Sequence, residues 1–268
     1  MNTSTFVARR DLVALGLLAA ACSAQAQISI DQNKALAGSV TPGDTPGFPV
    51  VLSVPGAYKL AGNLVVPAST DGLFLAAPNI TIDLNGFSIV GPVVCSGSAA
   101  ALTCAGAKEG SGIGGYSGMH GTTVRNGTVR GFGAQGVSLD RGATIERVTA
   151  ISNAGYGFAL YDNASISNSM ASDNGADGML LQSGGTIVNS RAHNNKGNGF
   201  TSNSYDSGQN REMGGEVRDS YASRNGALGF QSYGTPVSWI GNTAVMNAGC
   251  FNQGGKKVLN NVCNGVAN

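Results

Sequence analysis

A repeated segment of 14 residues occurs four times in the second half of the chain. Its copies run from Ile145 to Phe158, Ile166 to Met179, Ile187 to Phe200 and Val217 to Phe230, and the first three start 21 residues apart. Each copy opens with an aliphatic residue, carries an alanine and then an asparagine at fixed positions, and ends on a glycine followed by a large apolar residue. A fixed period of this length indicates that one supersecondary unit is stacked repeatedly, as in solenoid proteins.

The apolar positions within each copy alternate over short stretches and show no helical period. This pattern predicts short β-strands separated by turns. A coil of 21 residues, at about 3.3 Å per residue, has a contour of roughly 70 Å, which suits three short strands wound once around a narrow core. Such a coil cannot be stable alone, because its few inward side chains do not offset the cost of ordering the chain. Pairing with the coils above and below must supply the remaining stabilisation.

The recurring asparagine needs hydrogen-bond partners if it is buried. Stacked coils lie about 4.8 Å apart, so equivalent side-chain amides can hydrogen-bond along the axis as a ladder. The alternative is a row of ligand-binding amides; we favour the structural ladder. Its expected members are Asn153, Asn174, Asn195, Asn225 and Asn247.

Together with the segment Asn-Ile-Thr-Ile-Asp-Leu-Asn-Gly-Phe-Ser-Ile-Val-Gly at 79–91, these repeats resemble right-handed parallel β-helix proteins of the pectate-lyase-like superfamily. The likeness covers residues 48–264. It implies an all-β fold, a right-handed parallel β-helix of about eight coils with an N-terminal cap that closes the open end of the solenoid. We expect an export signal peptide at 1–26, the cap and the first strands at 27–63 with a short helix at 31–36, and the β-helix domain at 64–268.

The first residues have the pattern of a bacterial export signal. Arg9 and Arg10 precede an apolar run, 12–21, and Ala24-Gln25-Ala26 supplies a cleavage site of small residues. The arginine pair resembles a twin-arginine signal, but the general secretory route uses similar positive ends, so both routes remain open. The apolar run is too short for a permanent membrane anchor, and no later stretch is longer. The sequence therefore predicts a periplasmic or secreted protein without a membrane span.

Cleavage after Ala26 removes Cys22 and leaves an even number of cysteines. Neighbouring cysteines would then close two short loops in an oxidising compartment, with four free thiols as the alternative. The expected pairs are Cys95–Cys104 and Cys250–Cys263. No CxxC spacing occurs, so the cysteines do not indicate a metal site.

The mature chain carries no net charge. Losing the signal takes Lys+Arg from 16 to 14 and Asp+Glu from 15 to 14. A surface that binds a nucleic-acid duplex needs a concentrated basic field, and the longest basic run after the signal is Lys256-Lys257. We therefore expect no nucleic-acid partner.

The strand type represented by 158–161 is expected to present a row of polar and aromatic side chains to solvent. The predicted row is Asp140, Tyr161, Gln182, Asn203 and Tyr233, with Asp162 and Tyr205 at its edge. Two stretches that break the period, 92–110 and 204–214, would flank the same sheet. Polar groups beside aromatic platforms suit a saccharide, so this row is the candidate substrate-binding surface. An ordinary solvated sheet face is the alternative.

The superfamily resemblance implies a base and a cation if the protein is a lyase or an epimerase. The segment Tyr156-Gly157-Phe158 is similar to the catalytic segment of mannuronan epimerases, which continues with Asp-Pro-His. Here Ala159, Leu160 and Tyr161 follow instead, so the acid and the histidine of that mechanism are missing. Tyr161 is a candidate base only if its surroundings lower its pKa.

A second candidate catalytic cluster consists of Arg191 and His193, which are expected to share an outward face with Tyr221 and Asp173. An arginine base beside an acid would make a lyase conceivable. The alternative, which we favour, is a surface ion pair.

No cofactor site is evident, and Ca²⁺ is implied by the resemblance alone. Asp140 and Asp162 could fall one coil apart, but two acids are an incomplete site for an ion that takes about six to eight oxygens. The leading hypothesis is an exported protein that binds an acidic or neutral polysaccharide along one exposed parallel sheet, with cleavage by lyase or glycosidase chemistry left open. The alternative is a non-catalytic module of the envelope or cell surface, with a structural or adhesive role.

Overall fold

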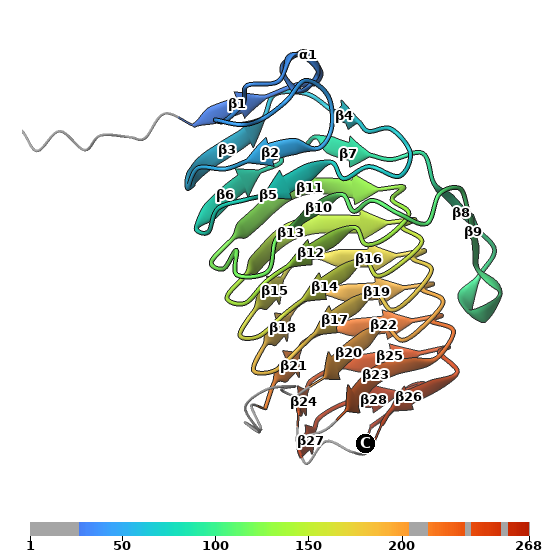
Figure 1. Ribbon diagram of the computed structural model, residues 1–268. Helices are drawn as coiled ribbons and strands as arrows, with labels where there is room; N and C mark the ends of the chain where they lie inside the picture. The colour runs from blue at the N-terminus through green and yellow to red at the C-terminus, as the bar shows by residue number, and fades with distance from the viewer. Residues whose placement is uncertain (1–26, 204–213, 234–236, 253–256, 268) are drawn as a thin grey trace, which may run out of the picture.

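The computed structural model describes residues 27–203, 214–233, 237–252 and 257–267. The chain winds into one stack of parallel coils, with helix α1 at one end and the last strands at the other (Figure 1). In the described part of the chain, one sheet has nine strands and another has 18; we call them sheet B and sheet A. The predicted parallel β-helix is confirmed, and its nine strands in sheet B are close to the eight coils expected.

Sheet B takes one strand from each coil. Its strands are β2 (Val50–Leu52), β5 (Leu73–Leu75), β10 (Ile113–Gly115), β12 (Val137–Leu139), β14 (Phe158–Leu160), β17 (Met179–Leu181), β20 (Phe200–Asn203), β23 (Leu228–Tyr233) and β26 (Gly249–Phe251). Neighbouring strands pair in parallel, with Val137 opposite Phe158 and Phe158 opposite Met179. A displacement of 21 residues in the sequence therefore becomes one step along the stack.

Sheet A takes two strands from each regular coil, in two rows. The first row contains β1 (Ile28–Ile30), β3 (Gly56–Leu60), β6 (Ile80–Asp83), β15 (Ser165–Ser167), β18 (Thr186–Val188), β21 (Glu216–Arg218), β24 (Ser238–Ile240) and β27 (Lys257–Leu259). The second contains β4 (Leu64–Val65), β7 (Ser88–Val90), β16 (Met170–Ser172), β19 (Arg191–His193), β22 (Tyr221–Ser223), β25 (Thr243–Val245) and β28 (Val262–Cys263). The long strands β11 (Thr123–Arg130) and β13 (Thr144–Ile151) run through both rows, and β29 (Val266–Ala267) pairs antiparallel with β28.

A short helix lies over the first coils. Helix α1 (Gln32–Ala37) begins after Asp31, whose carboxylate accepts a hydrogen bond from the Lys34 backbone N–H at 2.8 Å. This contact satisfies one of the donors that every helix start leaves open. Ala35, within the helix, is fully buried, so α1 closes the amino-terminal end of the core (Figure 1).

The core consists of like residues stacked from coil to coil. Phe200 lies on Phe230 with 4.9 Å between ring centroids, and Phe230 lies on Phe251 with 4.8 Å. A column of fully buried alanines runs along the second row of sheet A: Ala150, Ala171, Ala192, Ala222 and Ala244. The repeated small residue is explained by this position, since a larger side chain would collide with its copies in the neighbouring coils.

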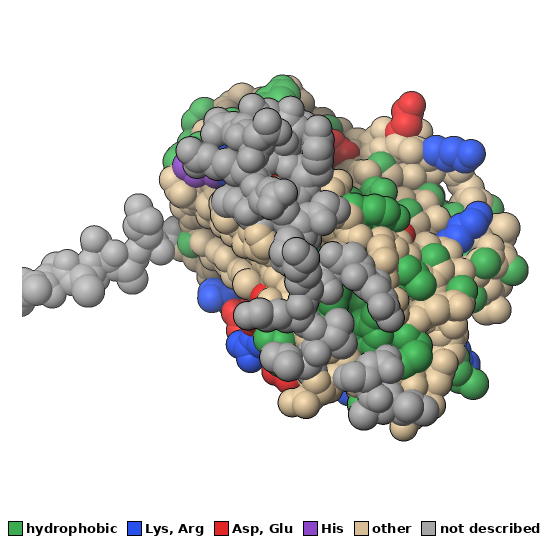
Figure 2. All heavy atoms as spheres, turned by 90° about the horizontal axis from the view of Figure 1, so that it is seen from below, with side chains coloured by type: hydrophobic (Ala, Val, Ile, Leu, Met, Phe, Trp, Pro, Cys, Tyr) green, Lys and Arg blue, Asp and Glu red, His purple; other side chains and the backbone are tan. Residues whose placement is uncertain are grey.

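The outer surface carries few charges. Figure 2, which views the stack from the end where the chain finishes, shows basic and acidic side chains side by side at the lower left and mostly uncharged groups elsewhere. Four ion pairs join described residues, among them Arg125–Asp83 at 3.2 Å and Arg147–Glu146 at 2.7 Å. Such exposed pairs contribute little, so the stability of the fold comes from inside the coils.

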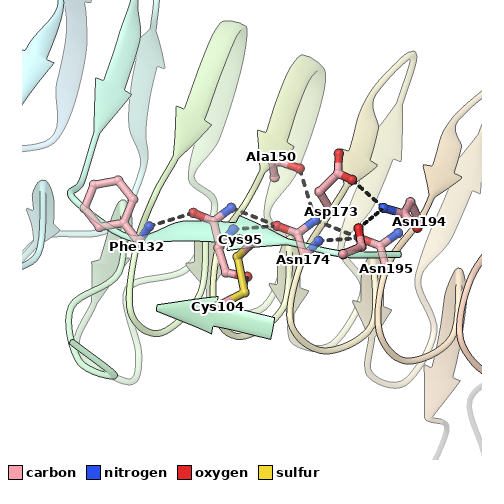
Figure 3. The surroundings of a disulfide bond; sticks show 10 residues. Cys95, Cys104, Phe132, Ala150, Asp173, Asn174, Asn194 and Asn195 are labelled. Carbon is pink, nitrogen blue, oxygen red and sulfur yellow. Dashed lines mark hydrogen bonds between the residues drawn. A yellow bond between two sulfur atoms is a disulfide. The ribbon is translucent and has the colours of Figure 1, made fainter. Parts of the chain in front are cut away.

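The recurring asparagines form a ladder of buried amides at the turn between sheet A and sheet B (Figure 3). The Asn174 Oδ1 accepts hydrogen bonds from the backbone N–H and the Nδ2 of Asn153, at 3.1 and 3.0 Å. Its Nδ2 donates to the Asn195 Oδ1 at 2.9 Å and to the Ala150 carbonyl at 3.1 Å. The ladder continues from Asn195 to Asn225 at 2.9 Å and from Asn225 to Asn247 at 2.8 Å.

The ladder explains the glycine that ends each repeat. A Cβ on Gly178 would lie 2.7 Å from the Asn195 Nδ2, and one on Gly157 would lie 2.8 Å from the Asn174 Nδ2. These distances are shorter than any Cβ contact can be, so the amide of the next coil occupies the space that a side chain would need.

A second ladder runs along the bend between the two rows of sheet A. The hydroxyl groups of Ser169, Ser190 and Ser220 each accept a hydrogen bond from a backbone N–H of the preceding coil, at 3.2 to 3.3 Å. Asn242 takes the same position in the next coil and accepts from the Ser220 N–H at 3.0 Å. This ladder was not predicted from the sequence.

The stretch that breaks the period at 92–110 contains a disulfide-closed hairpin. Strands β8 (Val94–Ser96) and β9 (Thr103–Ala105) pair antiparallel around a short 3₁₀ helix, Ala99–Ala101, and Cys95 is bonded to Cys104. The second expected bridge, Cys250–Cys263, is also present. The hairpin lies beside the coils instead of projecting from them: the Ala99 N–H donates to the Asn194 Oδ1 at 2.7 Å.

Replacing Asn174 with leucine, which is similar in size, should lower the free energy of unfolding by about 3 kcal/mol or more, because two buried donors of Asn153 lose their acceptor at about 1–3 kcal/mol each. Urea denaturation followed by circular dichroism measures the change. Thr186→Ala, on the exposed side of β18, is the control and should cost less than about 0.5 kcal/mol. Equal midpoints for the two variants would show that the ladder does not stabilise the stack.

Candidate functional site

The predicted row lies along one edge of sheet B. Each of its residues stands at the carboxyl end of a strand, from β12 to β23, and Asn203 pairs directly with Tyr233. Tyr161 and Tyr233 expose 46% and 53% of their surface, whereas Asp140, Gln182 and Asn203 are half-buried. Asp162 follows Tyr161 at the edge and is also half-buried. Tyr205 and most of the second period-breaking stretch lie outside the described residues.

Tyr116 belongs to the same row, although the sequence analysis did not include it. Strand β10 pairs with β12 with Ile113 opposite Val137, so Tyr116 occupies in its coil the position that Asp140 occupies in the next. Its ring is 63% exposed and stands edge-on against Phe74, with 4.7 Å between centroids. The row therefore has three exposed tyrosines, Tyr116, Tyr161 and Tyr233, with polar side chains between them.

A hollow of about 210 Å³ opens between the first two tyrosines. Tyr116 and Tyr161 form its sides, and Asp140 and Ser138 contribute polar atoms to its lining. The Asp140 carboxylate accepts hydrogen bonds from the backbone N–H groups of Gly118 and Arg141. Asp140 therefore fixes the loop after β10 beside the sheet, and the hollow is held open by backbone contacts.

A polar cluster at the opposite edge of sheet B was also missed by the sequence analysis. The Asp177 carboxylate accepts hydrogen bonds from the Thr201 hydroxyl at 2.6 Å and from the Asn198 backbone N–H at 2.7 Å. Tyr156 occupies the same repeat position as Asp177, one coil earlier. The signal was present in the sequence, since Tyr156, Asp177 and Asn198 each precede the glycine that ends a repeat.

The surroundings of Tyr156 keep its phenol protonated. Burial raises the pKa of Tyr156 above the usual tyrosine value, and the neighbouring groups of Asp177 and Tyr233 raise it further. A phenol with a raised pKa is neutral at physiological pH, so Tyr156 can donate a hydrogen bond to a ligand but does not act as a base.

The candidate catalytic residues do not come together. Arg191 and His193 lie on β19 of sheet A, whereas Tyr161 follows β14 of sheet B. Arg191 pairs with Tyr221 in the next coil, and the His193 Nδ1 lies 2.9 Å from the Ser223 Oγ. Within the described residues Arg191 forms no ion pair, so the surface ion pair considered for it is not found there.

Asp173, the acid proposed to accompany Arg191, has a different partner. Its carboxylate accepts a hydrogen bond from the Asn194 Nδ2 at 2.6 Å, and Asn194 in turn holds the hairpin through the Ala99 N–H (Figure 3). Asp173 therefore helps to position the hairpin.

The described residues do not fit a calcium ion. No group of three or more His, Cys, Asp or Glu side chains in that part of the chain is placed to hold a metal, and the Asp140 oxygens already accept two backbone N–H groups. A calcium ion takes about six to eight oxygens, which is more than these side chains supply. Across the same residues, no helix is long and apolar enough to cross a membrane.

Comparison with known proteins found similar solved structures and one matching family model. Among solved structures, the chain is similar to the A-modules of two mannuronan C-5 epimerases of Azotobacter vinelandii. The first, AlgE6, is 14% identical, with 78% of this chain and 79% of the other covered and a TM-score of 0.42. The second, AlgE4, is also 14% identical, with 75% and 79% covered and a TM-score of 0.33. No curated protein matches the sequence.

The family model gives a direct assignment. The model described as the right-handed beta helix region matches residues 111–264, which is more than half of the 268 residues. These residues contain all four repeats and the whole ladder of amides. The chain therefore belongs to the right-handed β-helix family.

Proposed function

We propose that this is an exported β-helix protein that binds an extended polysaccharide along the carboxyl edge of sheet B. The observation that carries the proposal is the row of three exposed tyrosines, Tyr116, Tyr161 and Tyr233, with a hollow between the first two. Aromatic rings present a flat apolar face and a polar hydroxyl, which suits the alternating faces and hydroxyls of a sugar ring.

The spacing of the row suits a repeating ligand. Tyr116 and Tyr161 are two coils apart, and Tyr161 and Tyr233 are three coils apart. Each coil advances by about 4.8 Å, which is close to the length that one sugar ring adds to an extended chain. A polysaccharide laid along the stack can therefore place a ring on each tyrosine while Asp140, Gln182 and Asn203 contact hydroxyl groups between them.

The charge of this face favours a neutral polysaccharide. The described residues that line the hollow include one carboxylate, Asp140, and no Lys or Arg. Asp162 adds a carboxylate beside Tyr161, and Asp177 adds another at the opposite edge of the sheet. A polyuronate would bring further negative charges against these groups, which like-charge repulsion disfavours.

The arrangement of the candidate catalytic side chains favours binding without turnover. Tyr161 is separated from Arg191 and His193 by its place on another sheet, and Tyr156 keeps its proton. Export is supported by the signal-like first residues and by two disulfides, which form in oxidising compartments.

Replacing Tyr161 with alanine should weaken binding to the preferred polysaccharide by about fivefold, because one aromatic contact is worth about 1 kcal/mol. Affinity gel electrophoresis against neutral glucans, mannans, xylans and polyuronates measures the change, and reducing-end and unsaturated-product assays on the same panel report any turnover. Tyr116→Ala should act similarly. Tyr221→Ala is the matched control, since Tyr221 is 40% exposed but lies on sheet A. Retardation by no polysaccharide, or an equal loss in Tyr221→Ala, would refute the assignment of the face.

Asp177→Asn should lower the pKa of Tyr156 towards the ordinary value of about 10, because the neighbouring negative charge that opposes the phenolate is removed. The ultraviolet absorbance of phenolate, followed during alkaline titration and compared with Tyr156→Phe, isolates this group. Asp219→Asn changes an exposed acid that follows β21 of sheet A; it is the control and should leave the titration unchanged. An unchanged Tyr156 curve in Asp177→Asn would mean that the two groups do not interact.

A further inference from the structure

A second hollow, of about 360 Å³, lies between the disulfide hairpin and the turns that carry the amide ladder. Its floor consists of Gly133, Ala154 and Gly175, which take equivalent positions in three consecutive coils. Leu102, Thr103 and Cys104 of the hairpin form the opposite wall. These three residues follow one another along the axis of the stack, so the hollow is elongated. We call it the slot.

The hairpin that covers the slot is fixed at its base and at its tip. At the base, the Val93 N–H donates to the Gly131 carbonyl at 2.8 Å. At the tip, Asn194 accepts from the Ala99 N–H at 2.7 Å, and its own Nδ2 donates to the Gly97 carbonyl at 3.4 Å. The Cys95–Cys104 bond closes the hairpin between these points (Figure 3). The wall of the slot is therefore held in place without a ligand.

A lysine stands at each end of the slot. Lys108 follows β9, in a segment that lies against Gly133, because a Cβ on that glycine would meet the backbone of Ala107 and Glu109. Lys196 follows Asn195 of the ladder. It takes the same position as Gly133, three coils further along the stack. Three coil steps correspond to roughly 14 Å between the backbone positions.

Neither lysine has an ion-pair partner among the described residues. In that part of the chain, the residues that line the slot include no Asp or Glu. Both lysines are exposed, and two positive charges beside one hollow raise the local concentration of anions. Between the lysines, the hollow is lined by the backbone of the two glycines and the Ala154 methyl group, while Leu102 is almost fully buried.

We propose that this slot binds a slender dianion, a molecule with a carboxylate at each end and an uncharged body between them. The ammonium groups of Lys108 and Lys196 hold the two carboxylates, the Gly-Ala-Gly floor admits a body of small cross-section, and the Thr103 hydroxyl is the one polar side chain between the ends. Linear dicarboxylates and acidic disaccharides share this chemistry. The site is separate from the tyrosine row and does not depend on the function proposed for it.

Titration calorimetry of the mature protein tests the proposal with succinate, adipate and suberate, with a galacturonate disaccharide, and with hexanoate as the single-charge comparison. The dicarboxylates should bind better than hexanoate by up to about fivefold, with an optimum length, because a second ammonium–carboxylate contact is worth up to about a factor of five. The disaccharide distinguishes a sugar ligand from a linear one. Added salt should weaken binding.

Lys108→Gln and Lys196→Gln should each reduce dicarboxylate affinity to the level of hexanoate and abolish the length dependence. Lys59→Gln, on β3 of sheet A, is the matched control and should bind like the unmodified protein. Chemical-shift changes at the Gly133, Ala154 and Gly175 amides locate the ligand independently of these variants. Absence of binding by every dianion, equal affinity for hexanoate and the dicarboxylates, or an equal loss in Lys59→Gln would overturn the proposal.

Discussion

The contact on which this structure depends is the buried amide shared between neighbouring coils. Asn174 uses both lone pairs of its oxygen and both hydrogens of its nitrogen, so its hydrogen-bonding capacity is filled by the coils above and below. An amide satisfied in this way can be buried at little cost, whereas one without partners would be destabilising. The geometry also fixes the spacing and register of the coils, because the four contacts are made together only at one displacement. The glycine at the end of each repeat follows from the same constraint.

Because the register between coils is fixed, residues that recur with the sequence period lie in one line on the surface. Features that follow this period could be predicted from the sequence, and others could not. The fold, the amide ladder and the exposed row followed from residues 21 apart, since the same residue type recurs at the same position. The serine ladder was missed because its positions change from Ser220 to Asn242, and serine is common on any solvated surface. Tyr116 was missed because the hairpin precedes it and shifts the count, although its register with Asp140 is regular.

The segment of the hairpin was recognised as a break in the period. Its position against the coils could not be predicted from the sequence. Its tip meets Asn194, 95 residues later in the chain, through a backbone N–H that any residue type supplies. Asn194 has a further constraint, since it precedes the ladder residue in a left-handed conformation with φ of 52°, which asparagine tolerates better than most residues. The sequence explains why asparagine stands there for the turn, and gives no sign that its side chain also holds the hairpin and Asp173.

The two candidate sites use the rigid stack in different ways. Along sheet B, the ligand is expected to follow the coils and to make a similar weak contact at several of them. Affinity should therefore grow with the length of polysaccharide that is bound. In the slot, the hairpin adds a second wall and limits the ligand to the length between Lys108 and Lys196, so specificity there comes from the ends. Both sites are ordered before binding. The amide ladder orders the row on sheet B, and the ladder together with the Cys95–Cys104 disulfide orders the slot. Little of the binding free energy is therefore spent on ordering the protein, and even single surface contacts can contribute measurably to affinity.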